Sequence, residues 1–417
     1  MTTAATHIPA YRRERASTFR PQEPCKPRHG STSLCHITTE HSQLKSRTFH
    51  RMCLPLAAKG FTISYLSPAS LPPDAEHIEF VRLPERRKFA RLGIGQLALL
   101  RTLWNHPADV YHFQDPQFLG LGLLLKLCFG KRVIYDAYED FPSMAASKAS
   151  IPSLLRPVFA KLVGLAESMA ARCFDAIITA DPFTLRRLAR IGHSRKVVFY
   201  NFPNLDFFPV PKEKPKAFDV VYRGGLSDRA GTFVLLDALQ RLALASQPVR
   251  LLLAGYSDNP TAEHQLRTQI NAMGLASSVQ VRGRVPHEEM ATLLAEAKLG
   301  VSPLQDTPKF RLNIPVKIFE YWACGLPVVA SDLPPSRAFV RNSGAGLLFP
   351  PGDATALARS IATLLENPKT ALQMGCRGRT LVEQRFNNTA EIRKLLSLFN
   401  TITAKAATAF EREAQHA

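Results

Sequence analysis

Short apolar runs with strand propensity alternate with amphipathic segments of helical period from Ser33 onward. The first unit has a strand at 34–37, a helix at 49–59 that is interrupted at Pro55, and a second strand at 61–66. A strand, a helix and a strand in this order pack as parallel strands joined by a crossover helix. Because the alternation continues almost to the end of the chain, the sequence predicts an α/β protein with parallel sheets.

The alternation is interrupted near the middle of the chain. The turn N-F-P-N at 201–204 is followed by a run rich in proline and lysine that ends at Pro215. Such a stretch is typical of a connection between domains, and 417 residues are enough for two domains with separate cores. We therefore predict a Rossmann-like domain over 31–205, a hinge over 206–216 and a second Rossmann-like domain over 217–386.

Residues 1–30 differ from the rest of the chain. They are polar and basic, contain four prolines and lack the apolar stretch of a signal peptide. Either a disordered N-terminal extension or a start assigned upstream of the true one accounts for this composition, and we expect the extension.

The formal net charge is +19, so an anionic partner or surface is expected. Nucleic acid is not expected, because there is no zinc-ligand spacing, no aromatic-basic motif for single strands and no clear helix-turn-helix. Nucleotide phosphates and anionic lipid headgroups fit better. The run from Arg82 to Arg101, with four basic residues between positions 86 and 91, is either a basic amphipathic helix on a membrane surface or an ordinary solvated helix face.

No apolar run approaches the roughly 18 residues of a membrane span. The seven cysteines are scattered without a C-x-x-C pair, which favours neither a zinc site nor a disulfide framework. We expect a cytoplasmic protein, either soluble or peripheral on the cytoplasmic face of a membrane, with no metal site.

Residues 313–332 read N-I-P-V-K-I-F-E-Y-W-A-C-G-L-P-V-V-A-S-D. Pro315 suits the first turn of a helix, because its missing N–H costs nothing there. Gly325 suits the position just past a helix end, since it adopts the left-handed conformation readily. This segment therefore predicts a short helix that leads into a buried strand at 328–330.

Lys317 and Glu320 lie three residues apart in this helix and so share one face. A lysine near a helix N-terminus opposes the helix dipole unless an anion is bound there. Free N–H groups and an ammonium suit a phosphate, and a carboxylate one turn later can accept hydrogen bonds from two sugar hydroxyls. The alternative is an ordinary ion pair on a solvated helix face.

Residues 301–352, which contain S-P-L-Q-D, the segment above and A-G-L-L-F-P-P-G-D, resemble the donor-site region of the retaining group 1 (family 4) glycosyltransferases, in the branch with N-x-P-x-K-x-F-E-Y. The resemblance spans roughly residues 33–400. It implies the GT-B fold, two Rossmann-like domains facing across a cleft, with a last helix, here 387–417, crossing back to the first domain. It also implies that Glu320 holds the ribose of a nucleotide-sugar. An earlier Glu that contacts the sugar in many members is Leu312 here.

A glycine loop, R-G-G-L-S-D-R-A-G-T, follows the strand predicted at 218–222. Backbone N–H groups in such a loop can bind pyrophosphate. The family usually has G-R-L-x-x-x-K-G here, but Gly225 takes the Arg position and Ala230 the Lys position. Arg229 and Arg223 are the available cations, and we predict that Arg229 contacts the diphosphate. The donor-binding residues predicted from these segments and from the strand and turn at 279–287 are Gly224, Gly225, Arg229, Arg284, Lys317 and Glu320.

Polar clusters follow the strands predicted at 109–113 and 132–135. Ligands gather at the carboxyl ends of strands in open α/β sheets, so these clusters should face the cleft. For the His in the first cluster, a hydrogen-bonded structural role is an equal alternative. The family often shows D-x-H-E at the second cluster, where Tyr138 replaces the His, and Lys45 replaces an Asp in an earlier loop. The predicted acceptor-side residues are His112, Asp115, Asp136 and Glu139.

The resemblance implies a metal-independent, retaining transfer of a hexosyl or N-acetylhexosaminyl group from a nucleoside diphosphate sugar to an acceptor hydroxyl, with no other cofactor. The acceptor would be a glycan or a lipid-linked glycan in polysaccharide assembly. Arg229 and Lys317 are the predicted catalytic residues, because cleavage leaves negative charge on the diphosphate. A nucleotide-sugar 2-epimerase with the same fold remains an alternative. So does an inactive scaffold, suggested by Leu312, Gly225, Ala230 and Tyr138.

Overall fold

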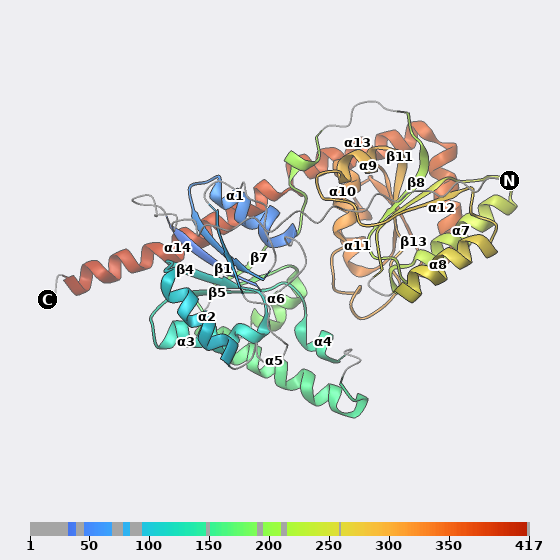
Figure 1. The fold of residues 1–417 in the computed structure, drawn as a ribbon. Helices are drawn as coiled ribbons and strands as arrows, with labels where there is room; N and C mark the ends of the chain where they lie inside the picture. Colours follow the sequence, from blue (N-terminus) through green and yellow to red (C-terminus); the bar gives the residue numbers. More distant parts are fainter. Residues whose placement is uncertain are drawn as a thin grey trace, which may run out of the picture.

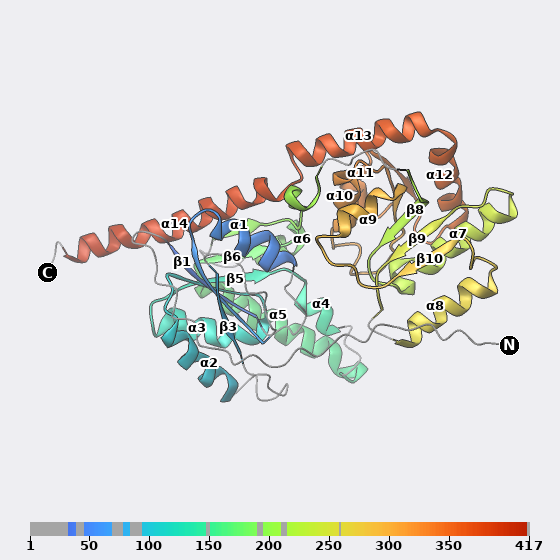
Figure 2. The same ribbon diagram turned by 45° about the horizontal axis from the view of Figure 1, so that its top comes forward.

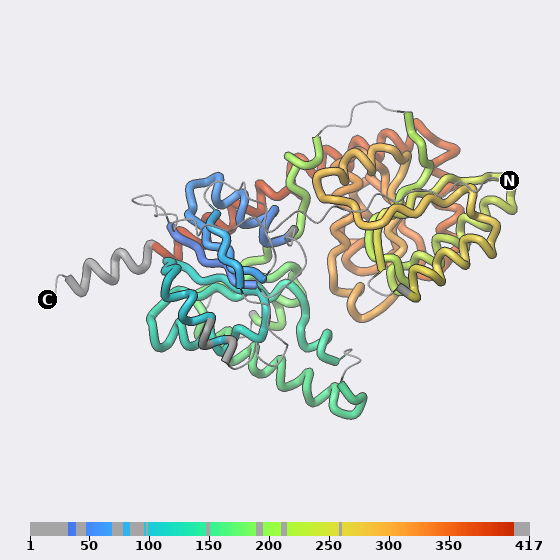
Figure 3. The backbone as a smooth tube through the Cα atoms, viewed as in Figure 1, coloured from blue at the N-terminus to red at the C-terminus, as the bar shows by residue number. Residues whose placement is uncertain are grey.

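The computed structural model describes residues 32–38, 46–68, 78–83, 94–146, 151–189, 195–209, 215–257 and 260–414 (Figure 3). The predictions for residues 1–30, for Lys45 and for the basic residues at 86–91 lie outside these ranges, as do residues 210–214 of the predicted hinge.

The first half of the chain forms one parallel sheet of seven strands in the order β3-β2-β1-β4-β5-β6-β7 (Figures 1 and 2). The order reverses at β1 and β4, which is the place where open α/β sheets bind ligands. The strands are β1 Ser33–Ile37, β2 Thr62–Ser67, β3 Ile78–Arg82, β4 Val110–Phe113, β5 Arg132–Ala137, β6 Ala176–Thr179 and β7 Arg195–Val198.

Helices cover both faces of this sheet. They are α1 Leu54–Ala57, α2 Ile94–Asn105, α3 Leu119–Leu127, α4 Phe141–Ala146, α5 Arg156–Cys173 and α6 Pro182–Ala189. A π-helical segment, Ser46–Cys53, precedes α1. The predicted interruption near Pro55 corresponds to the change from π-helix to α-helix at Leu54, which places Pro55 in the first turn of α1, where its missing N–H costs nothing.

The second half forms a parallel sheet of six strands in the order β10-β9-β8-β11-β12-β13. The strands are β8 Phe218–Arg223, β9 Leu251–Ala254, β10 Val279–Arg282, β11 Ala297–Ser302, β12 Val328–Ser331 and β13 Gly346–Phe349. The helices are α7 Thr232–Leu244, α8 Pro260–Ala272, α9 Met290–Ala295, α10 Val316–Ala323, α11 Pro334–Val340, α12 Ala354–Glu366 and α13 Pro368–Gln384. The two parallel sheets confirm the predicted α/β class.

The last helix, α14 Asn388–Ala414, leaves the second half and runs along the first (Figure 1). Its residues Ile392, Leu395 and Phe399 are buried in the same apolar cluster as Phe49 of the π-helical segment and Leu34 of the first sheet. Glu391 accepts a hydrogen bond from the backbone N–H of Tyr200 at 2.9 Å. The first domain is therefore completed by the C-terminal end of the chain.

Helix α10 shows how local sequence places the site. It begins directly after Pro315, and Gly325, which follows its end, has φ +67°. The backbone N–H of Leu326 donates to the carbonyl of Tyr321 at 2.9 Å, which closes the helix before β12. The predicted helix and strand are confirmed, and no helix among the described residues is long and apolar enough to cross a membrane.

Candidate nucleotide-sugar site

The glycine loop after β8 lies against the start of α10. Gly224 has φ +144°, and a Cβ at this position would lie 2.9 Å from Nζ of Lys317. Gly255, after β9, lies against the backbone of this loop, since a Cβ at Gly255 would lie only 1.7 Å from the carbonyl oxygen of Gly224. Both positions therefore require glycine, and together they leave the loop backbone beside the lysine.

Lys317 is buried in the first turn of α10. Its Nζ lies over the ring of Tyr222, 4.2 Å from the centroid, and makes no hydrogen bond or ion pair with the described residues. Burial, with the nearby charge of Arg223, lowers the pKa of Lys317 to about 7, although Glu320 acts in the opposite direction. A buried ammonium without a counterion is expensive, which indicates a site for an anion.

Glu320 is fully buried one turn further along α10. Its Oε1 lies 3.4 Å from Nη2 of Arg51, and its Oε2 lies 3.2 Å from Nη1 of Arg223. Oε2 nevertheless accepts no hydrogen bond from the described residues, although the Arg223 guanidinium is close to it. Buried carboxylate oxygens are normally hydrogen-bonded, so this oxygen is free to accept from a ligand hydroxyl.

The alternative interpretation of Lys317 and Glu320 as a solvated ion pair is wrong. Both side chains are buried, and they form no ion pair with each other within the described part of the chain. Glu320 is instead paired with arginines on other elements.

Arg51 is a site residue that the sequence did not reveal. It lies in the π-helical segment of the first domain, reaches Glu320 in the second, and donates from Nε to the carbonyl of Phe202 at 3.0 Å. Its only sequence signal is the four-residue spacing from Arg47 within the segment S-R-T-F-H-R-M-C. Burial lowers the pKa of Arg51 to about 10, so it stays charged at neutral pH.

Two histidines border the same region. The rings of His50 and His287 lie 5.5 Å apart. Burial lowers the pKa of both, for His287 to about 4. Both imidazoles are therefore neutral at pH 7 and can accept as well as donate hydrogen bonds.

The other predicted donor-binding residues are more exposed. Gly225 and the Arg229 side chain are exposed, and Arg229 forms no side-chain hydrogen bond or ion pair with the described residues. Its carbonyl accepts from the N–H of Gln305 at 3.0 Å. Arg284 stacks on the ring of Tyr256 at 3.9 Å. The structure thus joins Gly224, Lys317 and Glu320 closely, while roles for Gly225, Arg229 and Arg284 stay predictions.

Two of the predicted acceptor-side residues are buried inside the first domain. Asp136 binds Arg47 through both oxygens, at 2.8 and 3.0 Å, and accepts from Gln114 at 2.6 Å. Burial is the largest single influence and raises the pKa of Asp136, but Arg47, His112 and Gln114 together outweigh it and lower the pKa. Nδ1 of His112 lies 2.9 Å from Nδ1 of His36. Both side chains are already partnered, and contacts from them to an acceptor stay predictions.

This buried pair gives a stability prediction. Arg47→Met should lower the free energy of unfolding by about 3 to 5 kcal/mol, because Asp136 is left charged and buried. Urea unfolding of the variant measures the loss. Arg341→Met is the matched control, because its ion pair with Asp332 is exposed and should contribute less than about 1 kcal/mol. Equal losses for the two variants would contradict a special role for the buried pair.

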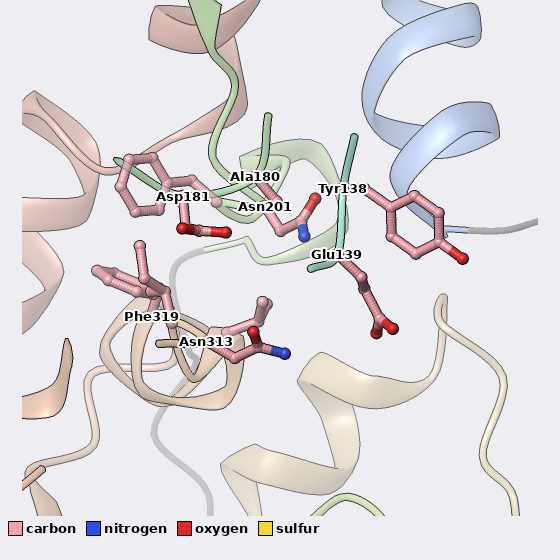
Figure 4. Close-up of a pocket in the computed structure, with 10 residues that line it drawn as sticks. Tyr138, Glu139, Ala180, Asp181, Asn201, Asn313 and Phe319 are labelled. Atoms are coloured by element: carbon pink, nitrogen blue, oxygen red, sulfur yellow. The ribbon is translucent and has the colours of Figure 1, made fainter. Parts of the chain in front are cut away.

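A cavity of about 200 Å³ lies between the two domains beside α10 (Figure 4). Its polar lining includes Glu139, Asp181 and Asn201 from the first domain and Asn313 from the second. Glu139 also pairs with Lys309 of the second domain at 3.4 Å. Asp115 is half-buried at the end of β4 and does not line this cavity. Of the predicted acceptor-side residues, Glu139 alone lines it.

Each half of the chain matches a family model. Residues 46–207 match Glycosyltransferase Family 4, and residues 217–367 match Glycosyl transferases group 1. The chain belongs to the group 1, family 4 glycosyltransferases.

This glycosyltransferase is 28% identical to the phosphatidyl-myo-inositol mannosyltransferase of Mycobacterium leprae (strain TN) over 328 residues, which is 75% of this chain and 81% of the relative. Sucrose-phosphate synthase from Thermosynechococcus elongatus has a TM-score of 0.72 at 20% identity, with 90% of this chain and 100% of that chain covered. Anabaena Alr3699/HepE in complex with UDP-glucose has a TM-score of 0.70 at 17% identity, with 88% and 99% covered. These structural likenesses confirm the GT-B fold.

Proposed function

We propose that this glycosyltransferase moves a sugar, with retention of anomeric configuration and without a metal ion, from a nucleoside diphosphate sugar to a hydroxyl of a glycan or lipid-linked acceptor. One observation carries the proposal. Lys317 and Glu320 are both buried on one face of α10. The Lys317 ammonium forms no hydrogen bond or ion pair with the described residues, and Oε2 of Glu320, although 3.2 Å from Arg223, accepts no hydrogen bond from them. A diphosphate satisfies the first group and a ribose hydroxyl satisfies the second.

The charges around α10 suit the leaving group. Breaking the anomeric bond places negative charge on the diphosphate, and Lys317 beside the Gly224 backbone is placed to stabilise it. Arg51 and Arg223 together carry two positive charges against the single negative charge of Glu320, so one positive charge is left without a counterion in this group. Under this proposal the departing diphosphate takes the proton of the acceptor hydroxyl as that oxygen bonds to the anomeric carbon from the same face.

The interdomain cavity supports an acceptor on the side of the first domain. Glu139 and Asn201 offer carboxylate and amide groups for sugar hydroxyls, whereas both oxygens of Asp181 already accept hydrogen bonds at the start of α6 (Figure 4). One relative is a phosphatidyl-myo-inositol mannosyltransferase, and another, 29% identical over 178 residues, is an amylovoran biosynthesis glycosyltransferase of Erwinia amylovora. We therefore propose a role in polysaccharide or glycolipid assembly.

A turnover assay tests the reaction class. The purified protein is incubated with UDP-, GDP-, ADP- and dTDP-sugars, with and without glycolipid acceptors, and the products are followed by mass spectrometry and NMR. The proposal predicts release of a nucleoside diphosphate and, with acceptor, a product with the donor's anomeric configuration. A changed sugar without an acceptor would indicate the epimerase. No turnover of any donor would indicate the scaffold.

Donor affinity should depend on pH. Burial places the pKa of Lys317 near 7, and only the protonated form attracts a diphosphate. Affinity should therefore be highest below about pH 7 and fall by up to about tenfold per pH unit above it. Calorimetric titration with a nucleotide-sugar, whose diphosphate does not titrate in this range, measures the profile. Lys317→Arg should flatten it, and an unchanged profile in that variant would contradict the assignment.

A further inference from the structure

The outer face of α5 is apolar although it is exposed. Seven large apolar side chains each keep 44% to 89% of their surface accessible: Leu154, Leu155, Val158, Phe159, Leu162, Leu165 and Met169. Five of them, beginning at Leu155, are spaced alternately three and four residues apart, which makes one continuous stripe. Exposed apolar side chains that are this contiguous mark an interaction surface.

The charges on this helix are all of one sign where it meets solvent. Lys161 and Arg172 are exposed, and Arg156 is partly exposed. The single acidic residue of α5, Glu167, is buried and bound by Tyr135 and Arg187. The surface defined by these apolar and basic side chains is therefore amphipathic and cationic.

A groove beside the stripe adds a polar feature. A cavity of about 440 Å³ lies between α4 and α5, lined by Ser143, Lys161, Ser168, Arg187 and neighbouring small residues. Arg187 is already paired there, with Asp140 at 3.1 Å and with Glu167 at 2.6 Å, and the Ser143 hydroxyl donates to Asp140. Lys161, which forms no ion pair with the described residues, is therefore the lining cation available to a phosphate group.

We propose that α5 docks on a membrane surface containing anionic phospholipid, with its apolar stripe in the lipid and Lys161 beside a headgroup phosphate. An interfacial helix of this kind combines an apolar face with basic residues. A second copy of the chain fits less well, because the positions flanking the stripe offer Lys161 but no acid to pair with it.

The position of the surface relates it to the proposed function. Helix α4 follows directly after Glu139, which lines the interdomain cavity, and α5 packs beside α4 at the periphery of the first domain (Figures 1 and 2). A membrane against α5 therefore lies close to the proposed acceptor cavity. This step rests on the proposed function, whereas the docking itself does not.

Vesicle co-sedimentation of the full chain tests the proposal. The vesicles are phosphatidylcholine alone or an equal mixture with phosphatidylglycerol. Leu162→Gln with Leu165→Gln should lower binding to the anionic vesicles by about tenfold, since both side chains are exposed and glutamine maintains the helix. Lys161→Gln should also lower this binding. The matched control is Leu244→Gln with Leu372→Gln, which changes two leucines on other helices that are more exposed than the two on α5.

The proposal is overturned if the wild-type chain does not bind anionic vesicles, or if the α5 variant binds them as the wild type does. It is also overturned if light scattering shows a wild-type dimer that the α5 variant converts to monomer, because the occupant is then a second copy. Nucleotide-sugar binding measured on the same variants separates the two proposals. The α5 variant should bind the donor normally. If it loses membrane binding but still binds the donor, the loss is due to the changed surface of α5 and not to the nucleotide-sugar site.

Discussion

Replacing Lys317 by Met is expected to lower the rate of sugar transfer by roughly 100- to 1,000-fold. The ammonium is buried beside the glycine loop without a counterion, where it is placed to stabilise the diphosphate as charge develops. The same substitution should leave thermal stability unchanged or raise it, because a buried and unpaired charge is replaced by an apolar side chain of similar length. Steady-state kinetics and a melting curve measure the two effects.

The combination of lost rate and retained stability distinguishes a functional lysine from a structural one. Lys369→Met is the control, because Lys369 is exposed on α13 and should affect neither quantity. A Lys317→Met variant that transfers sugar at the wild-type rate would show that the diphosphate is held elsewhere, and Arg229 would then be the first residue to test.

Replacing Glu320 by Gln is expected to raise the KM for the donor by about 100-fold, because a charged hydrogen bond to the ribose is lost. It should also lower the free energy of unfolding by about 3 kcal/mol, since Arg51 is left buried without its counterion. Kinetics with varied donor and urea unfolding measure these effects.

A matched control separates this site from general effects of the substitution. Glu263→Gln removes an exposed carboxylate from an ion pair within α8 and should change neither the KM nor the stability measurably. If Glu320→Gln lowered stability but left the KM for the donor unchanged, Glu320 would be a structural residue that joins the two domains, and its proposed contact with the ribose would be wrong.

The local features of α10 could be predicted from sequence because short-range chemistry determines them. Pro315 and Gly325 define the ends of the helix, and the three-residue spacing of Lys317 and Glu320 places them on one face. The parallel sheets could also be predicted, because apolar runs and amphipathic helical segments alternate along the chain.

The partners of Glu320 could not be predicted, because they depend on how distant segments pack. Arg51 lies 269 residues away in sequence and on the other domain. Asp136 shows the same limit, since its place after a buried strand indicated a ligand contact, whereas Arg47, 89 residues away, holds it inside the domain. Spacing along the chain contains no information about such contacts.

The packing also bears on the departures from the family pattern. Gly225 and Ala230 occupy positions where the resemblance implies cations for the diphosphate. In this structure Arg51, Arg223 and Lys317 surround Glu320 from three different elements. Positive charge near Glu320 is therefore present despite these substitutions.

The most direct test of the central claim is thermal stability of the purified protein against UDP-, GDP-, ADP- and dTDP-sugars, repeated with Lys317→Met and Glu320→Gln. A ligand that binds only the folded state raises the melting temperature by mass action. We expect a rise of several degrees with one class of donor, and a much smaller rise in both variants. An equal rise in the variants, or none with any donor in the wild type, would contradict a nucleotide-sugar site on α10.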